Sequence, residues 1–233
     1  MQKILGAMRR CCQDFDMIKP GDRIAVGVSG GKDSLLLLYA LALYRDHMGI
    51  PFEVEAITLE TGIPPADYTP VRELCQKLNV PCTIEHTEIS EIVFNRRHEK
   101  NPCALCAKLR RGALNDIALK HGCNKVALGH HRDDTLETFM LSMFYEGRLN
   151  TFKPVTHLDR TGLTVIRPLL YVSEKQIIGA VRKLDLKVVK STCPANGVTK
   201  REDMKQLLDD ICKRIPTARQ YMLNAIKESR LWE

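Results

Sequence analysis

The chain has 233 residues, of which 44% are hydrophobic and 27% are charged. This composition is typical of a globular protein, and the length is sufficient for one sizeable core. No apolar run is long enough to span a bilayer, and the first residues lack the charged-then-apolar pattern of a signal peptide. These features favour a cytoplasmic protein in which the 9 cysteines are free thiols rather than a disulfide framework.

The net charge of +7 is compatible with a polyanionic partner such as nucleic acid. Its placement is more informative, because basic residues gather on both sides of two cysteine sites. They are Arg96, Arg97, Lys100, Lys108, Arg110 and Arg111 around the first site, and Lys183, Lys187, Lys190, Lys200 and Arg201 around the second. Solvated faces also carry such clusters, but two clusters that both flank cysteines indicate a nucleic-acid path.

Strand and helix patterns alternate along the chain. The predicted strands are 23–28, 52–59, 81–86, 125–129, 164–167 and 187–189. The predicted helices are 34–45, 69–78, 103–121, 134–145, 173–184, 201–214 and 217–228. This alternation predicts an α/β fold with a parallel sheet covered by helices on both faces. We expect one domain over residues 1–215, with 216–233 as a C-terminal helix packed on it.

A phosphate-binding turn is predicted between the first strand and the first helix. Its sequence is Ser29-Gly30-Gly31-Lys32-Asp33-Ser34. Adjacent glycines allow a sharp turn, and the following helix directs unpaired N–H groups at it. Lys32 adds a positive charge, and Ser29 and Ser34 add hydroxyl donors. The Walker A spacing is absent, and the run resembles the pyrophosphate loop (PP-loop) of ATPases that cleave between the α and β phosphates.

Other segments should meet this loop at the carboxyl edge of the sheet, where ligands of open parallel sheets bind. Thr58 and Leu59 end the second strand, and Gly129 ends the fourth. We expect these three residues to border an adenine.

The segment after the fourth strand carries two adjacent carboxylates, Asp133 and Asp134. Acidic residues are common at helix starts, and one of them would serve as a plain N-cap under the simpler interpretation. Mg²⁺ prefers one or two carboxylates together with phosphate oxygens. Asp33 and Asp133 are therefore the expected magnesium ligands, and Asp134 is expected beside the nucleotide. The neighbouring His131 is interpreted equally as a structural or a catalytic residue.

A second site is indicated by Cys103 and Cys106, whose C-x-x-C spacing is typical of a metal site or a redox pair. Because Pro102 begins the predicted helix, both thiols and Arg110 share one helix face. A metal site needs a further ligand, and Cys193 in a polar loop is the best candidate. Three thiolates with an open fourth position fit zinc or an iron–sulfur cluster, and the spacing alone does not separate the two.

These residues together resemble the TtcA family, the ATP-dependent tRNA 2-thiocytidine synthetases of the PP-loop group. The resemblance extends from about residue 14 to residue 216. Its motifs are 15–18, 21–24, 29–34, 103–112, 127–134, 143–145 and 166–169. The family commonly has a second C-x-x-C near its third cluster ligand, whereas this chain has Cys193-Pro194-Ala195-Asn196, which keeps three ligands.

The resemblance implies a Rossmann-like adenine nucleotide α-hydrolase fold with ATP, Mg²⁺ and an oxygen-sensitive [4Fe-4S] cluster. The cluster ligands carried onto this chain are Cys103, Cys106 and Cys193. It also implies a tRNA anticodon-loop cytidine as substrate and a sulfur donor such as a cysteine desulfurase or free sulfide. Many proteins of the group form dimers, which leaves a homodimer open.

The mechanism expected from these parts is adenylation of a base carbonyl followed by replacement of its oxygen with sulfur. Lys32, Asp33, Asp133 and Arg110 are the expected catalytic residues. The residues expected to bind ATP are Ser29, Gly30, Gly31, Lys32, Asp33, Ser34, Thr58, Leu59, Gly129 and Asp134. The alternatives are a PP-loop thiolase for another tRNA nucleoside, a PP-loop amine ligase, a small-molecule sulfur enzyme, and a zinc-stabilised tRNA-binding protein.

Overall fold

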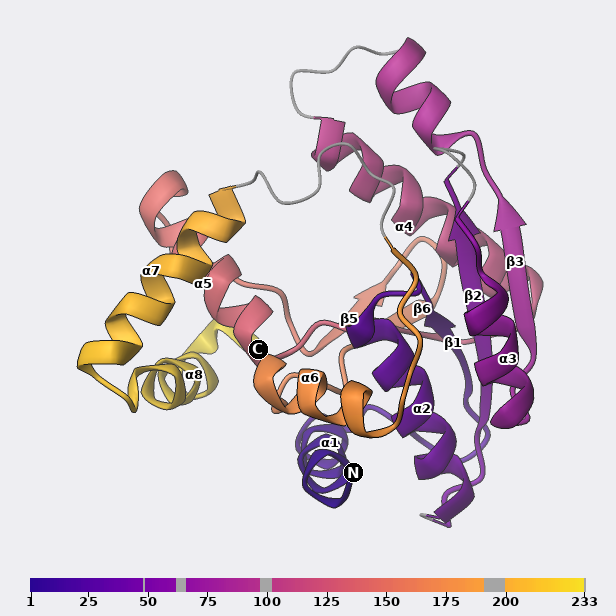
Figure 1. Ribbon diagram of the computed structural model, residues 1–233, viewed down its shortest axis with the longest axis horizontal. Helices are drawn as coiled ribbons and strands as arrows, with labels where there is room; N and C mark the ends of the chain where they lie inside the picture. The colour runs from indigo at the N-terminus through magenta and orange to yellow at the C-terminus, as the bar shows by residue number, and fades with distance from the viewer. Residues whose placement is uncertain (48, 62–65, 97–101, 191–199, 233) are drawn as a thin grey trace.

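The computed structural model describes residues 1–47, 49–61, 66–96, 102–190 and 200–232 (Figure 1). At its centre is a 6-stranded sheet in the order β3-β2-β1-β4-β6-β5. All neighbouring strands are parallel except β5, which pairs antiparallel with β6 at one edge. The strands are β1 (Arg23–Gly27), β2 (Glu53–Glu60), β3 (Cys82–His86), β4 (Lys125–Ala127), β5 (Val155–Leu158) and β6 (Leu163–Ile166).

Helices cover both faces of this sheet. The α-helices of the described ranges are α1 (Gln2–Asp14), α2 (Lys32–His47), α3 (Thr69–Lys77), α4 (Pro102–Lys120), α5 (Arg132–Glu146), α6 (Glu174–Lys183), α7 (Lys200–Arg214) and α8 (Ala218–Glu228). A π-helical turn η1 (Glu91–Arg96) precedes α4, and a 3-10 turn η2 (Arg230–Trp232) follows α8. No helix in the described ranges is long and apolar enough to cross a membrane.

Alternation of side chains along the strands produces two hydrophobic cores. Ala25 and Val126 face α4, where they pack with Leu114. Ile24 and Val26, the neighbours of Ala25 in β1, belong to the opposite core with α2. Successive residues of a strand point to opposite faces, so a strand buried on both sides is apolar throughout. This confirms the predicted α/β sheet with helices on both faces.

Three parts of the fold differ from the predicted elements. Helix α1 was not predicted, although Ile4, Met8 and Cys11 form its buried stripe. The edge strand β5 was also missed, because only four residues pair there and they alternate weakly. The predicted strand 187–189 is wrong: this segment has no strand structure, and Val189 N donates a single hydrogen bond to Gly30 O at 3.0 Å.

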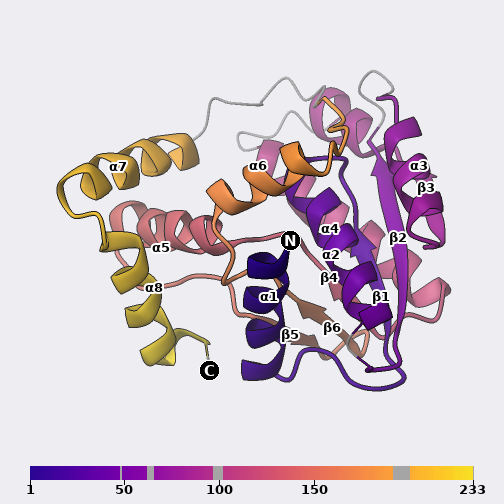
Figure 2. The same ribbon diagram turned by 60° about the horizontal axis from the view of Figure 1, so that its bottom comes forward.

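The C-terminal helices α7 and α8 pack on α5, away from β2 and β3 (Figure 2). Trp232 returns to the N-terminal part of the chain and meets Phe15 edge-to-face, with ring centroids 5.5 Å apart. The helix after residue 215 therefore rests on the rest of the chain, and its expected division from residues 1–215 stays a prediction.

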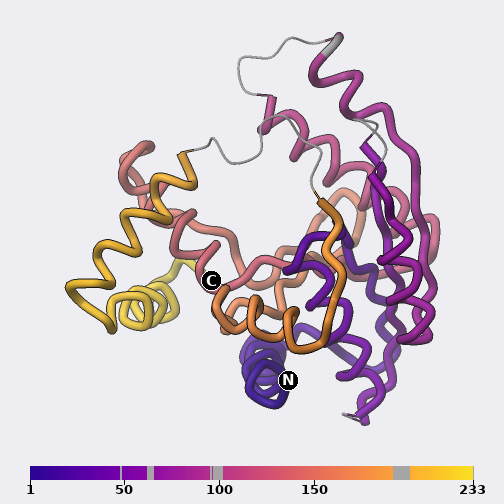
Figure 3. The backbone as a smooth tube through the Cα atoms, in the orientation of Figure 1, coloured from indigo at the N-terminus to yellow at the C-terminus, as the bar shows by residue number. Residues whose placement is uncertain are grey.

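The strand order reverses at β1, which lies between β2 and β4. The connections that leave β1 and β4 therefore diverge, and ligands of open α/β sheets bind at such a point. The segment after α6 runs back along the start of α2 toward the same edge (Figure 3). The sheet edge that carries the candidate site is fixed by topology before any side chain is considered.

Candidate active site

The phosphate-binding turn lies between the end of β1 at Gly27 and the start of α2 at Lys32. Its two serine hydroxyls, Ser29 Oγ and Ser34 Oγ, are 3.2 Å apart. Ser34 Oγ donates to Gly31 O at 3.0 Å, and Ser29 N donates to Ser34 Oγ at 3.2 Å. The hydroxyls therefore stabilise the turn, and the N-terminus of α2 faces the sheet edge, which is the arrangement that anion binding requires.

Gly30 has a backbone φ of +80°, and a Cβ atom built on it would lie 2.7 Å from Val189 Cβ. We expect Gly30→Ala to lose about 2 kcal/mol or more of unfolding free energy, from left-handed strain and this contact. Affinity for ATP should fall about tenfold, the equivalent of roughly 1.4 kcal/mol. Chemical denaturation and equilibrium ATP binding measure the two effects.

The matched control is Gly21→Ala, because Gly21 has a similar φ of +85° with nothing within 4 Å of an added Cβ. It carries the backbone strain without the contact to the segment after α6. Equal losses of stability in both variants would contradict the importance of that contact.

Lys32 is held between two carboxylates. Its Nζ lies 3.0 Å from Asp33 Oδ2 and 3.1 Å from Glu174 Oε1. Burial alone would lower the pKa of Lys32, but Asp33 and Glu174 outweigh it and hold the pKa above its ordinary value. Glu174 also pairs with Lys205 at 2.9 Å, and the two lysines overcome burial to lower the pKa of Glu174. The loop therefore carries a fixed positive charge at neutral pH.

Helix α5 begins with a capping box formed by His131 and Asp134. Asp134 N donates to His131 Nδ1 at 3.3 Å, and His131 N donates to Asp134 Oδ2 at 3.0 Å. His131 is only 3% exposed, and its Nε2 lies 3.6 Å from Asp33 Oδ1. The structure thus makes His131 the N-cap of α5 and brings the start of α5 against the start of α2, while a catalytic role for His131 stays a prediction.

Asp133 is buried with its oxygens turned toward other protein groups. Its Oδ1 lies 2.9 Å from Arg219 Nε of α8 and 3.6 Å from Arg132 Nη2. Its Oδ2 accepts a hydrogen bond from Glu174 N at 2.9 Å. The magnesium role expected from the sequence would require Asp133 to release one of these partners.

A further carboxylate, Glu137, lies one turn along α5 and is 5% exposed. Burial raises the pKa of Glu137 to about 7, and Asp134 adds to this effect. Arg201 of α7 opposes it from 3.6 Å and also contacts Asp134 at 3.2 Å. This group, absent from the sequence analysis, titrates close to neutrality at the edge of the candidate site.

We expect Glu137→Gln to remove a pH-dependent loss of stability. The folded-state pKa of Glu137 is above its ordinary value of 4.5, so the folded protein retains a proton between pH 4.5 and about 7 that the unfolded chain releases. The free energy of unfolding of the unmodified protein therefore falls through that window, by on the order of 3 kcal/mol. The variant should gain this amount relative to the unmodified protein above pH 7 and little below pH 4.5.

Denaturant titrations at several pH values test this. The control is Glu146→Gln on the same helix, where Arg148 holds the pKa of Glu146 below its usual range. A gain in the free energy of unfolding in both variants above pH 7 would contradict the assignment of this gain to the burial of Glu137.

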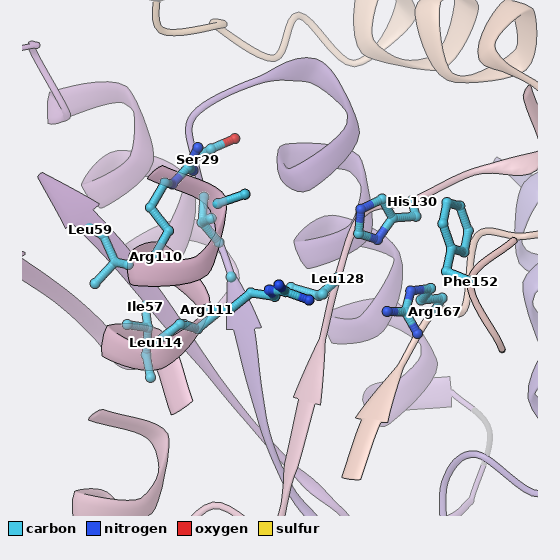
Figure 4. Close-up of a pocket in the computed structure, with 13 residues that line it drawn as sticks. Ser29, Ile57, Leu59, Arg110, Arg111, Leu114, Leu128, His130, Phe152 and Arg167 are labelled. Atoms are coloured by element: carbon cyan, nitrogen blue, oxygen red, sulfur yellow. The ribbon is translucent and has the colours of Figure 1, made fainter. Parts of the chain in front are cut away.

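A cavity of about 490 Å³ lies beside the loop, between the carboxyl edge of the sheet and α4 (Figure 4). Its lining residues come from β1 and β2, from α4, and from the segments around β4 and β6. They are Gly27, Val28, Ser29, Ile57, Leu59, Ala107, Arg110, Arg111, Leu114, Leu128, His130, Phe152 and Arg167. Ser29, Leu59 and Arg110 are the expected site residues among them. The size is that of a small-molecule site, and none of these lining residues, all from the described ranges, carries a carboxylate.

Two residues expected beside adenine have other surroundings. Thr58 is fully buried, and its hydroxyl has no hydrogen-bond partner in the part of the chain that the structure describes. Gly129 allows β4 to approach α2, because an added Cβ would lie 3.1 Å from Ser34 N. Neither residue is among those that line the cavity, so their expected place beside adenine stays a prediction.

The cysteine pair lies at the N-terminal end of α4, with Cys103 exposed and Cys106 partly buried. Arg110 follows on the same helix and reaches the cavity. Cys193 lies outside the described residues. Within those residues no group of three or more His, Cys, Asp or Glu side chains could hold a metal. The described residues therefore include two of the three cysteines expected as ligands, and this ligand set stays a prediction.

Sequence reasoning missed several residues that complete the site. Glu174 follows Ser173, whose capping box with Gln176 was visible in the sequence, but nothing local indicated that it would meet Lys32. His130 and Arg167 belonged to recognised motifs without an assigned role. No sequence pattern indicated that Phe152 belongs to the site, because it lies in an irregular segment between α5 and β5.

The glycine turn at the strand-order reversal and the lysine held over it define an α/β nucleotide-binding protein of the PP-loop class. The sequence profile of the PP-loop domain family matches residues 4–206. Among solved structures, the chain superposes on the U34-tRNA thiolase NcsA from Methanococcus maripaludis with a TM-score of 0.79. That likeness covers 95% of this chain and 76% of the other at 24% identity, and it shows a shared fold.

Curated relatives are closer in sequence. The tRNA-cytidine(32) 2-sulfurtransferase of Pelobacter propionicus is 41% identical over 228 residues, covering 97% of this chain and 85% of that protein. The protein of the same name from Geobacter sulfurreducens is 38% identical, covering 97% of this chain and 89% of its own length. The chain belongs to this tRNA-cytidine(32) 2-sulfurtransferase (TtcA) family of PP-loop proteins.

Proposed function

We propose that this protein is an ATP-dependent tRNA thiolase that converts an anticodon-loop cytidine into 2-thiocytidine. One observation carries the proposal: the cavity beside the PP-loop is closed by α4, the helix that presents Cys103 and Cys106. A site for activating an oxygen with ATP and a site for holding sulfur chemistry therefore share one helix. The names of the relatives at 41% and 38% identity support the same reaction.

The residues on the PP-loop side of the cavity would activate ATP. The N-terminus of α2 and the charge of Lys32 would hold the β and γ phosphates and stabilise the pyrophosphate that leaves. The apolar wall of Val28, Ile57 and Leu59 would receive the adenine. Arg110 reaches the cavity from α4 and would contact the phosphate at which the reaction occurs.

Asp33 is the carboxylate that best fits a magnesium ion bound with ATP. Its Oδ1 is buried and has no hydrogen-bond partner among the described residues, while its Oδ2 contacts Lys32. Mg²⁺ usually takes one or two carboxylates together with phosphate oxygens and water, so a pre-built cage is not required. We propose Asp33 as the magnesium ligand, with Asp133 joining only if it leaves Arg219.

Cys103 and Cys106 fit two corners of a [4Fe-4S] cluster, with Cys193 as the third ligand. When bound, the cluster would supply a site for the incoming sulfur atom next to the cavity. The chain's own contribution is to hold the cytosine, orient its O2 toward the α phosphorus and exclude water from the activated base. The overall change balances as ATP, hydrosulfide and the cytosine C2=O giving AMP, pyrophosphate and the C2=S base.

Two partners complete the proposal. The tRNA anticodon loop is the substrate, and the basic residues Arg110 and Arg111 would contact its backbone. The sulfur donor is a cysteine desulfurase or free sulfide. We further propose a cytoplasmic location. The proposed reaction is compatible with either a monomer or a homodimer.

The experiment is anaerobic reconstitution with iron and sulfide, followed by mass spectrometry of nucleosides from tRNA incubated with ATP. The expected product is 2-thiocytidine, formed together with AMP and pyrophosphate. Lysidine-type amination, thiolation of another nucleoside, or turnover without tRNA would each identify one of the alternative functions and overturn the proposal.

The variant Cys103→Ala should lose iron and lower thiolation by about tenfold or more, because a two-thiolate site holds a cluster poorly. ATP binding should remain, since Cys103 is exposed and does not line the cavity. Cys212→Ala on α7 is the matched control for a partly buried thiol outside the site. Full iron content and full thiolation in Cys103→Ala would show that the cluster assignment is wrong.

A further inference from the structure

One end of the cavity, where the segment after β4 meets the segments before β5 and after β6, differs in chemistry from the rest. Here His130, Phe152 and Arg167 come together from three separate segments (Figure 4). The Phe152 ring lies 4.8 Å from the His130 ring, with 36° between their planes. The Arg167 guanidinium carbon lies 5.2 Å from the centre of the same Phe152 ring. We call these three residues the distal group.

Both polar members of the distal group hold buried atoms without partners. His130 Nδ1 and Arg167 Nε are out of contact with water and have no hydrogen bond within the described ranges. Arg167 is nevertheless fixed in place, because its Nη1 donates to Lys153 O at 2.6 Å and to Thr156 Oγ1 at 3.4 Å. Both side chains also line the cavity, so a ligand that reaches them there can supply hydrogen bonds that the described residues do not.

The protonation states of His130 and Arg167 limit the kinds of ligand that the distal group can bind. Burial and the nearby Arg167 lower the pKa of His130 to about 4, so its ring is neutral at physiological pH and one nitrogen accepts a hydrogen bond. Burial also lowers the pKa of Arg167, to about 10, which leaves it a cation that can only donate. In the tautomer that places the acceptor nitrogen of His130 toward the cavity, the pair presents one acceptor and one obligate donor.

Cytosine matches this pair and uracil does not. Cytosine offers an amino group at N4, which donates, and N3, which accepts. In uracil both positions are reversed, because O4 accepts and N3 carries a hydrogen. Recognition through N3 and N4 also leaves the cytosine O2 free, and O2 is the atom that must be activated. The apolar wall at the other end of the cavity remains for adenine.

We propose that the distal group is the subsite for the target base, in which His130 accepts from the cytosine N4 amino group and Arg167 donates to N3. Phe152 positions both side chains by packing against them. The inference rests on the proposed function and deepens it, because it assigns the choice of cytidine over uridine to named residues.

The test compares two tRNA transcripts that differ only in having cytidine or uridine at the target position. The variants are His130→Asn and Arg167→Lys, which remove the ring acceptor and the planar donor. The preference for cytidine, measured as the ratio of kcat/KM values, should fall about tenfold or more in each. The KM for ATP should change by less than about twofold, because the loop and apolar wall are intact.

Matched controls lie on the hairpin that carries Arg167. His157→Asn changes an exposed residue of β5, and Arg160→Lys changes an exposed residue of the turn before β6. Neither should alter the ratio. A ratio does not depend on the fraction of folded enzyme, so loss of stability in Arg167→Lys would not mimic the expected result.

An unchanged ratio would overturn the proposal, and a parallel rise in the KM for ATP would assign the distal group to the nucleotide instead. Equilibrium binding of anticodon-loop RNA with a non-hydrolysable ATP analogue gives a readout without turnover. A cytidine preference in binding that both variants lose supports the subsite even if the unmodified enzyme yields no thiolated nucleoside, an outcome that would reject only the proposed reaction. Equal binding of cytidine and uridine RNA by the unmodified enzyme would reject the subsite.

Discussion

Replacing Lys32 by Met is expected to lower ATP-dependent thiolation by about 10² to 10³-fold, the usual effect of losing a donor at developing charge. The substitution keeps the length of the side chain and removes only its charge. Lys32 is fixed by Asp33 and Glu174 at 3.0 and 3.1 Å, so the charge is already in place when the nucleotide arrives. Pyrophosphate release in the presence of tRNA and equilibrium binding of ATP measure the effect.

The control for this prediction is Lys205→Met, because Lys205 is the other lysine that contacts Glu174. Each variant leaves Glu174 with one lysine, and Lys32→Met removes the contact with Asp33 as well. Lys205 does not adjoin the PP-loop in sequence, and its loss should reduce turnover only severalfold. Equal losses in the two variants would show that the network, and not the charge at the loop, supports catalysis.

The PP-loop was predictable because its signals are local. Strand, glycine pair, lysine and helix start follow one another without interruption, and each has a direct backbone or charge consequence. The strand–helix alternation that gave the fold class is local in the same sense. For the same reason the C-x-x-C pair was placed correctly on one face at the start of α4.

The partners of these groups were not predictable, because tertiary packing brings them together. Glu174 meets Lys32 only after the sheet has set α6 beside α2. The distal group joins a loop residue, the end of β6 and an irregular segment, none of which predicts the others. Two carboxylates at the start of α5 were visible in the sequence, and one was interpreted as a plain N-cap. The fold shows that the N-cap is His131, that Asp134 is its partner in the capping box, and that Asp133 turns toward α8.

Asp133→Ala is expected to reduce the free energy of unfolding by about 3 to 5 kcal/mol, the usual result of removing one partner of a buried ion pair. The Asp133 side chain is 9% exposed and contacts Arg219 at 2.9 Å. Its loss would also leave the N–H of Glu174 unpaired at the start of α6. Denaturant unfolding, followed by far-UV circular dichroism, measures the change.

A double-mutant cycle with Arg219→Met separates the structural role from a metal role. If Asp133 mainly anchors α8, the coupling energy with Arg219 should be large, because Arg219→Met removes the charge that Asp133→Ala would leave with Asp209 as its remaining partner. If Asp133 mainly binds magnesium, stability should change little, coupling with Arg219 should be near zero, and the magnesium concentration needed for ATP turnover should rise.

Asp33→Asn provides the contrast, because Asp33 has a buried oxygen without a hydrogen-bond partner in the described structure. This variant should show the magnesium effect without the large loss of stability. The two aspartates expected from the sequence to act together would then have separate tasks, Asp33 at the nucleotide and Asp133 in joining the C-terminal helices to the catalytic edge of the sheet.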